Sequence, residues 1–160
     1  PEDLLRKVLA ARTFNQGCAT VEYVSSALVD LEFHSLQSAE ALDVSRFERE
    51  TLDRLGMPEE IVMRHRSPHF QHIFAGASYS SAYYSYMWSE VLDADAFRAF
   101  EEAGDVFDPA TAHRLRDNIY AAGGRRASDE AYIAFRGKLP SVDALLERRG
   151  LLDAVPAGEA

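Results

Sequence analysis

The sequence predicts an all-α protein, a bundle of about seven helices that forms one domain over residues 1–155. Apolar residues recur every three to four positions through nearly all of the 160 residues, as they do along the buried face of a helix. The alternating pattern of a half-buried strand is hard to find. With 47% hydrophobic and 27% charged residues, the chain can bury one globular core.

Two long helices are expected in the first 36 residues. Leucine, valine and phenylalanine form a stripe of helical spacing over residues 2–14, and two acidic residues near its start favour a helix N-terminus. The tripeptide Asn-Gln-Gly at 15–17 interrupts this helix. A second helix is predicted to begin near Thr20 and to end near Leu36.

Two shorter segments follow. Residues 39–55 combine a polar connection with a short helix, which the glycine and proline of residues 56–58 stop. Residues 59–64 have the composition of one further helical turn. Ser67-Pro68 then interrupts the helical pattern, because a residue that precedes proline is disfavoured in the α conformation.

The next helix is predicted over residues 83–100, and four of its residues are expected to be buried: Trp88, Val91, Leu92 and Ala96. Asp108-Pro109 supplies an N-cap and a proline at the first helical position. A helix is therefore expected from there to about residue 121.

Two last helices are expected before the C-terminus. Ser128 is predicted to cap one of them, and Ser141 the other. Residues 156–160, with their proline, glycine and glutamate, are expected to be a frayed tail.

The charge and cysteine content exclude several classes of protein. With 26 acidic and 17 basic residues the net charge is −9, which would repel a nucleic acid, and the short arginine pairs cannot form a binding arm. Cys18 is the single cysteine, so no disulfide framework is expected, and a lone thiol in an apolar helix start is typical of a small buried residue. No run reaches the roughly 18–20 apolar residues that span a bilayer. We expect a cytoplasmic protein without nucleic-acid or membrane partners.

The simplest catalytic motifs are missing from the sequence. His65, His69 and His72 are closely spaced, but a proline interrupts them and no carboxylate lies among them, so surface or capping histidines are favoured over a metal site. No His-Glu-x-x-His motif and no Gly-x-Ser-x-Gly motif occurs. Two carboxylate pairs, Glu101/Glu102 and Asp93/Asp95, are expected to lie on solvated helix faces.

The stretch HIFAGASYSSAYYSYMW, residues 72–88, is unusually rich in tyrosine. If the stretch is helical, Tyr79, Tyr83 and Tyr86 fall within an arc of about 60°, opposite an apolar face. These rings could pack against a neighbour with their hydroxyls in water. They could equally donate hydrogen bonds into a cleft, where a neutral phenol stabilises a developing oxyanion. The pattern alone leaves both interpretations open.

The same stretch resembles the C-terminal signature of the thimet oligopeptidase and peptidyl-dipeptidase family of zinc metallopeptidases. Its pattern is similar to His-x-Phe-x-Gly-x-x-Tyr-x-x-x-Tyr-Tyr-x-Tyr-x-Trp. The likeness extends over residues 14–34, 108–124 and 134–151, and so covers nearly the whole chain. Residues 14–34 and the closing Arg-Arg-Gly-Leu look most like bacterial peptidyl-dipeptidases.

The resemblance implies an all-helical, two-lobed enzyme with a deep channel that admits short peptides. Family members hold zinc through the histidines of a His-Glu-x-x-His motif and a later glutamate, which would lie upstream of the region resembled here. The chain begins at Pro1 without a methionine, as a piece of a longer protein would. Zinc is therefore expected in the full-length parent but not in this chain. The expected partners are short peptides and the N-terminal part of the parent.

The resemblance also implies roles for single residues. Tyr86 matches the tyrosine that hydrogen-bonds the oxygen of the tetrahedral intermediate, and Tyr79 matches the tyrosine that closes on bound peptide. His72 matches the histidine at the start of the glycine-rich loop, and Gly76 and Tyr83 complete the expected substrate-binding set. The sequence departs from the family where glycine is common, with Ala77, Ser78 and Ala82 instead. Because glycine permits hinge motion, these residues are expected to stiffen the loop.

The leading prediction is thus the substrate-channel portion of a peptidyl-dipeptidase, inactive by itself. One alternative is an oligopeptidase of the same family that cuts internally, and another is a non-catalytic helical interaction module. A fragment of this kind could also form a homodimer through an exposed apolar face.

Overall fold

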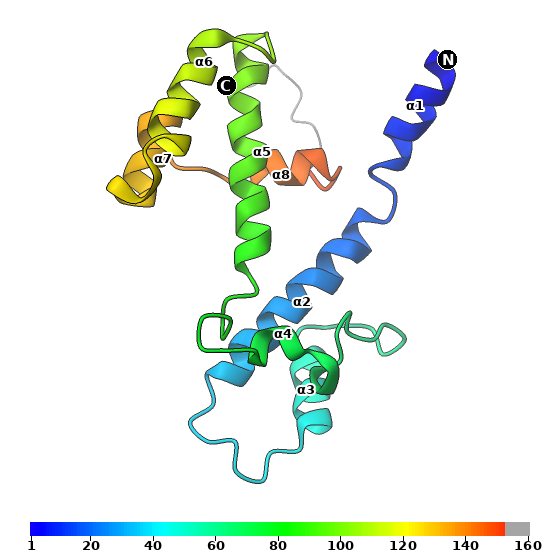
Figure 1. Cartoon of the computed structure of the whole chain (residues 1–160). Coiled ribbons are helices and arrows are strands. Elements are labelled where there is room, and N and C mark those ends of the chain that lie inside the picture. Colours follow the sequence, from blue (N-terminus) through cyan, green and yellow to red (C-terminus); the bar gives the residue numbers. More distant parts are fainter. Residues whose placement is uncertain (153–160) are drawn as a thin grey trace. The chain divides into compact units, whose positions relative to one another are not determined.

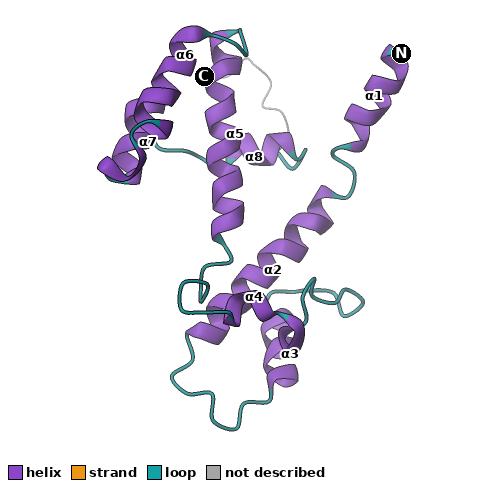
Figure 2. Ribbon diagram, viewed as in Figure 1, coloured by secondary structure: helices purple, strands orange, loops and turns teal. Residues whose placement is uncertain are grey.

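The computed structural model describes residues 1–152, and its regular elements are all helical within that range. Figure 2 shows helices joined by loops, with no strand in the described part. The all-α prediction is confirmed. The prediction of about seven helices is also close, since one of the eight α-helices, α4 (Gln71–Phe74), is a single turn. The expected frayed tail lies outside the described residues.

The chain divides into two compact units, Pro1–Met87 and Trp88–Ala160, which are described separately. The single domain predicted over residues 1–155 stays a prediction. No described helix combines the length and the apolar character that a membrane span requires.

The first unit holds α1 (Glu2–Ala11), α2 (Gln16–His34) and α3 (Val44–Arg54), then the short 3₁₀ helix η1 (Ser67–His69) and α4 (Figure 1). The break between α1 and α2 is narrower than predicted, because α2 already begins at Gln16 and includes Gly17. The break spans residues 12–15 and ends at Asn15, which has a left-handed φ of 55° that asparagine tolerates better than most residues.

The core of the first unit forms where the segment 63–83 packs on α2. Six buried residues make this core, with Tyr23, Phe33 and Leu52 against it: Ala27, Val29, Met63, Phe70, Ile73 and Tyr83. By contrast α1 buries none of its residues. The tyrosine-rich stretch packs against α2, because its residues Ile73 and Tyr83 belong to the same core as Ala27 and Val29.

Two predictions for the first unit are wrong. Residues 59–64 form no helical turn; the N–H of Ile61 bonds the carbonyl of Pro58 at 3.0 Å in an isolated turn. Cys18 is exposed, because the early part of α2 lies outside the core that the rest of the helix enters.

The second unit holds most of α5 (Ser85–Ala103), then α6 (Pro109–Leu115), the π-helical turn η2 (Arg116–Tyr120), the short η3 (Gly123–Arg125), α7 (Ser128–Arg136) and α8 (Asp143–Arg148). The start of α6 is as predicted, since the Asp108 carboxylate accepts the N–H of Thr111 at 2.6 Å. Ala99, Tyr132 and Phe135 form the buried core, against which Leu92 and Ile119 pack.

Three predictions for this unit are corrected. Ser128 is the first residue of α7 and caps nothing with its side chain, and Ser141 instead donates to the carboxylate of Asp143 at 2.9 Å. Val91 is buried as expected, but Trp88 is 48% exposed. Trp88 lines an apolar groove of about 610 Å³ between α5, η2 and α7 and so keeps one side open.

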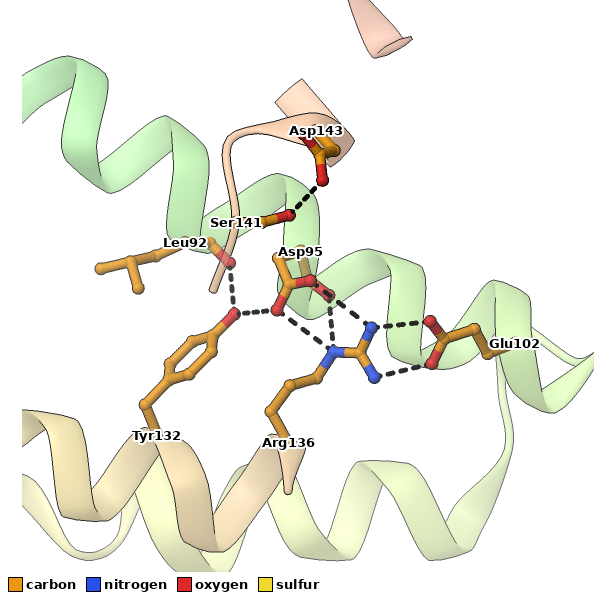
Figure 3. Close-up of polar contacts among 7 residues, drawn as sticks. All are labelled: Leu92, Asp95, Glu102, Tyr132, Arg136, Ser141 and Asp143. Carbon is orange, nitrogen blue, oxygen red and sulfur yellow. Dashed lines mark hydrogen bonds and ion pairs between the residues drawn. The ribbon is translucent and has the colours of Figure 1, made fainter. Parts of the chain in front are cut away.

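A buried polar network joins α5 to α7 (Figure 3). Asp95 is only 2% exposed, so its predicted place on a solvated face is wrong. Its carboxylate accepts the Tyr132 hydroxyl at 2.8 Å and Arg136 Nε at 3.2 Å. Arg136 also donates to both oxygens of Glu102, at 2.6 and 2.8 Å. These bonds compensate for the cost of burying a carboxylate.

Candidate functional site

The tyrosine-rich stretch is mostly a loop. Residues 75–84 connect α4 to α5 through successive tight turns, including bonds from the N–H of Tyr79 to Gly76 at 2.9 Å and from Ser85 to Ala82 at 3.0 Å. Tyr79 and Tyr83 therefore precede α5, whereas Tyr86 lies in its first turn. The helical arc predicted for the three tyrosines is wrong, because the turns end the helical periodicity.

A buried carboxylate on α2 holds this loop. Asp30 is fully buried, and its oxygens accept the N–H of Ser81 at 3.1 Å and the N–H of Tyr83 at 3.0 Å. Nδ1 of His34 lies 2.8 Å from the same carboxylate. The hydroxyl of Tyr23, also on α2, donates to the carbonyl of Tyr83 at 2.6 Å. The backbone around Tyr83 is thus bonded to α2 on both its N–H and its C=O side.

His72 lies at the centre of the tyrosines. Its Nε2 is hydrogen-bonded to the hydroxyl of Tyr86 at 3.0 Å. Its ring centroid lies 4.8 Å from that of Tyr79, edge to face, and 5.9 Å from that of Tyr83. The structure therefore brings together four of the five residues that the resemblance selected: His72, Tyr79, Tyr83 and Tyr86.

These tyrosines differ in exposure. Tyr83 is 9% exposed and stacks on Tyr23 with ring centroids 5.1 Å apart, so it belongs to the core. Burial raises the pKa of its phenol above the ordinary value. Tyr79 and Tyr86 are 43% and 49% exposed and can reach a ligand. Tyr83 therefore has the packing role, whereas the exposure of Tyr79 and Tyr86 leaves both interpretations open for these two residues.

A pocket of about 490 Å³ lies beside Tyr86 within the first unit, a size typical of small-ligand sites. Aromatic and basic residues and one glutamine make its wall: Tyr23, Arg64, His65, His69, Phe70, Gln71, His72, Tyr83 and Tyr86. The wall has no carboxylate, although the chain as a whole carries a charge of −9. Tyr79 contacts His72 but is not part of the wall.

Gly76 has no steric reason to be glycine in this conformation. A Cβ added to it would meet only Cδ2 of Tyr79, at 3.9 Å, which is an ordinary contact. The left-handed position in the loop falls instead on Ser81, with φ 58°. The stiffening expected from Ala77, Ser78 and Ala82 stays a prediction.

The histidines of this region do not form a metal site. No group of three or more His, Cys, Asp or Glu side chains within residues 1–152 is placed to hold a metal ion. The ring of His65 instead packs on Phe70, with centroids 5.0 Å apart, while His69 ends η1. The described part of the chain therefore does not fit the zinc ion that the resemblance implies for the parent.

Sequence reasoning missed two features of the site. Asp30 stands in the apolar run Ala-Leu-Val-Asp-Leu, where a charged residue at a core position can indicate a buried hydrogen-bonding role. Arg64 belongs to one of the short arginine pairs of the sequence, and nothing in its spacing indicates a pocket.

The family to which this fold belongs follows from its similarity to a protein-family model. Residues 1–151 match the model of peptidase family M3. The chain belongs to this family. The match covers both units of this M3 chain and includes every residue of the pocket.

Relatives of this M3 chain have two kinds of name. It is 40% identical, over 96% of its length, to the probable cytosolic oligopeptidase A of Arabidopsis thaliana. It is 35% and 36% identical, over 94% of its length, to the dipeptidyl carboxypeptidase and the oligopeptidase A of Escherichia coli (strain K12). In each case it covers 22% of the relative. The chain thus spans about a fifth of the length of the relatives it matches.

Proposed function

We propose that this chain forms part of the substrate-binding wall of a peptidase that hydrolyses short peptides, and that Tyr86 donates a hydrogen bond to the oxygen of the tetrahedral intermediate. The observation that carries the proposal is the hydrogen bond of the Tyr86 hydroxyl to His72 Nε2 at 3.0 Å. The Tyr86 side chain is half exposed and lines the 490 Å³ pocket. Family membership supports a peptidase.

The pair of Tyr86 and His72 suits such a donor. When Nε2 of His72 carries the proton, the imidazole donates to the phenol oxygen, and the phenol proton is free for a further acceptor. A neutral donor held in this way stabilises negative charge as it develops on a carbonyl oxygen. In this proposal Tyr79 contacts the bound peptide; its half-exposed ring, edge to face with His72, supports that role.

In this proposal the zinc ion is bound outside residues 1–152. Enzymes of family M3 are zinc-dependent in general, and residues 1–152 do not provide a metal-binding group. We infer that the ion is held by another part of the complete polypeptide, to which this chain is a partner. The isolated chain is then expected to hydrolyse no peptide. The name of the plant relative supports a cytoplasmic protein.

The decisive test is Tyr86→Phe in the complete polypeptide. Removing one oxyanion donor typically lowers kcat by about 10²–10³-fold, with a much smaller change in KM. Tyr84→Phe is the matched control, since Tyr84 is 53% exposed and lies outside the pocket wall. If both variants keep the wild-type kcat, Tyr86 has no part in the reaction. If the wild-type complete protein also cleaves no peptide, the helical interaction module is the better proposal.

The relatives' names support two modes of cleavage. An enzyme named dipeptidyl carboxypeptidase and enzymes named oligopeptidase A are all similar to this chain. A peptidyl-dipeptidase remains our lead proposal, with internal cleavage as the alternative. The two differ in whether the pocket recognises the free C-terminus of the peptide.

A further inference from the structure

The pocket beside Tyr86 has a basic side without an internal counter-charge. Arg64, His65 and His69 line it together with Gln71, and no carboxylate of the described residues joins them. The side chain of Arg64 is exposed and has no hydrogen bond or ion pair within residues 1–152. Arg66, two residues later, instead donates to the buried Glu48 at 2.6 Å. A cation left unpaired in a pocket of an acidic protein is available to an anionic ligand.

Arg64 also acts on the tyrosines of the same pocket. Burial raises the pKa of Tyr83, the nearby positive charge of Arg64 opposes that rise, and Tyr86 and the carboxylate of Glu22 add to it more weakly. The charge of the Arg64 guanidinium therefore acts on the Tyr83 phenol. The ring centroids of Tyr83 and Tyr86 are 5.6 Å apart.

A guanidinium recognises a carboxylate better than any other side chain does, through two parallel N–H···O bonds. A pocket of about 490 Å³ is large enough for the end of a short peptide but not for a long one. When the carbonyl that reacts lies beside Tyr86, the C-terminal carboxylate of the bound peptide would lie near Arg64.

We propose that Arg64 is a specificity-determining residue, which binds the free C-terminal carboxylate of a short peptide in the pocket lined by Tyr86 and His72. The inference rests on the proposed function and deepens it, because it selects peptides that end soon after the cleaved bond. The shared chemistry is a carboxylate, which an acidic side chain of the peptide could also supply.

The test measures binding by the complete polypeptide in the presence of a metal chelator, so that hydrolysis cannot deplete the probe. The probes are three N-terminally fluorescein-labelled alanine tetrapeptides: one with a free C-terminus, one with a C-terminal amide, and one amide with glutamate as its last residue. Fluorescence anisotropy gives each Kd. The wild type is expected to bind the free acid about tenfold to a hundredfold more tightly than the plain amide.

In Arg64→Gln this preference should fall to within about twofold, while Arg64→Lys should keep part of it. Arg46→Gln is the control of equal charge change, since Arg46 pairs with Glu50 on the exposed side of α3 and lines no described pocket. It should keep the full preference. Equal circular dichroism of all variants would exclude misfolding.

Three results would overturn the inference. They are a wild type that does not distinguish acid from amide, a preference that survives in Arg64→Gln, and a glutamate amide that binds as tightly as the free acid. Hydrolysis by the metal-replete wild type is assayed separately. Loss of discrimination with intact hydrolysis refutes only the role of Arg64, whereas discrimination without hydrolysis refutes only the proposed function.

Discussion

Oδ2 of Asp30 accepts the backbone N–H of Tyr83 at 3.0 Å, although the two residues are 53 positions apart. Its other oxygen accepts the N–H of Ser81 at 3.1 Å, and the residue is fully buried. The carboxylate of Asp30, together with the hydroxyl of Tyr23, therefore holds the loop of residues 75–84 that leads to Tyr86. The placement of the candidate donor depends on a residue that itself lies outside the pocket wall.

Asp30→Ala is expected to loosen this loop. The buried N–H of Tyr83 and the partly buried N–H of Ser81 lose a charged acceptor, and a bond to a charged group is worth about 1.5–3 kcal/mol. Amide hydrogen exchange at Ser81 and Tyr83 should accelerate by about tenfold or more. Asp93→Ala is the control, because Asp93 is an exposed residue of the second unit. Unchanged exchange at both amides would show that other contacts hold the loop.

The stability of the first unit should fall in acid through Glu48. Burial acts to raise the pKa of this carboxyl, but its bonds with Ser67 and Arg66 outweigh burial and hold the pKa below its usual value. A lowered folded pKa means that the stabilisation is complete above the unfolded value of about 4.3 and is lost as the pH falls through the folded value.

The measurement is the free energy of unfolding against pH, from about pH 6 to the acid transition. Glu48→Gln should have a smaller slope below about pH 4.3 than the wild type. Glu50→Gln, a change on the exposed face of α3, should keep the wild-type slope. Parallel curves for the wild type and Glu48→Gln would remove Glu48 from the explanation.

The loop should respond to substitution at Ser81 and not at Gly76. A β-branched residue is strained at φ 58°, so Ser81→Val should destabilise the protein by about 1–2 kcal/mol. Gly76→Ala should change stability by less than about 0.5 kcal/mol, because its Cβ meets only the Tyr79 ring at 3.9 Å. Urea unfolding of both variants checks this. A larger loss from Gly76→Ala would mean that the loop has another conformation.

The sequence predicted those elements that local chemistry controls. Asp108-Pro109 starts α6 as expected, since a carboxylate cap and a fixed φ act within one turn. Val91 is buried as its spacing on α5 requires. The family resemblance added His72 and Tyr86, whose contact at 3.0 Å joins residues 14 positions apart.

The features that the sequence did not predict depend on tertiary contacts. The sequence pattern predicts an exposed charge at Asp95, whereas in the structure Tyr132 and Arg136 of α7 bind its buried carboxylate. Tyr79 and Tyr83 fit a helical wheel, but their backbone forms turns before α5 begins, in which Asp30 accepts the N–H groups of Ser81 and Tyr83. No local pattern contains the partner in either case, so periodicity could not have found it.

The buried network of the second unit gives the largest expected effect on stability. Arg136→Ala leaves Asp95, 2% exposed, without its cation, and breaking a buried ion pair typically costs about 3–5 kcal/mol. Arg148→Ala removes an ion pair with Asp93 in which both side chains are more than half exposed, so it should cost about 0–1 kcal/mol. Urea unfolding followed by helical circular dichroism compares the two variants. Equal losses would mean that the Tyr132 hydroxyl, 2.8 Å from the Asp95 carboxylate, is enough to satisfy it.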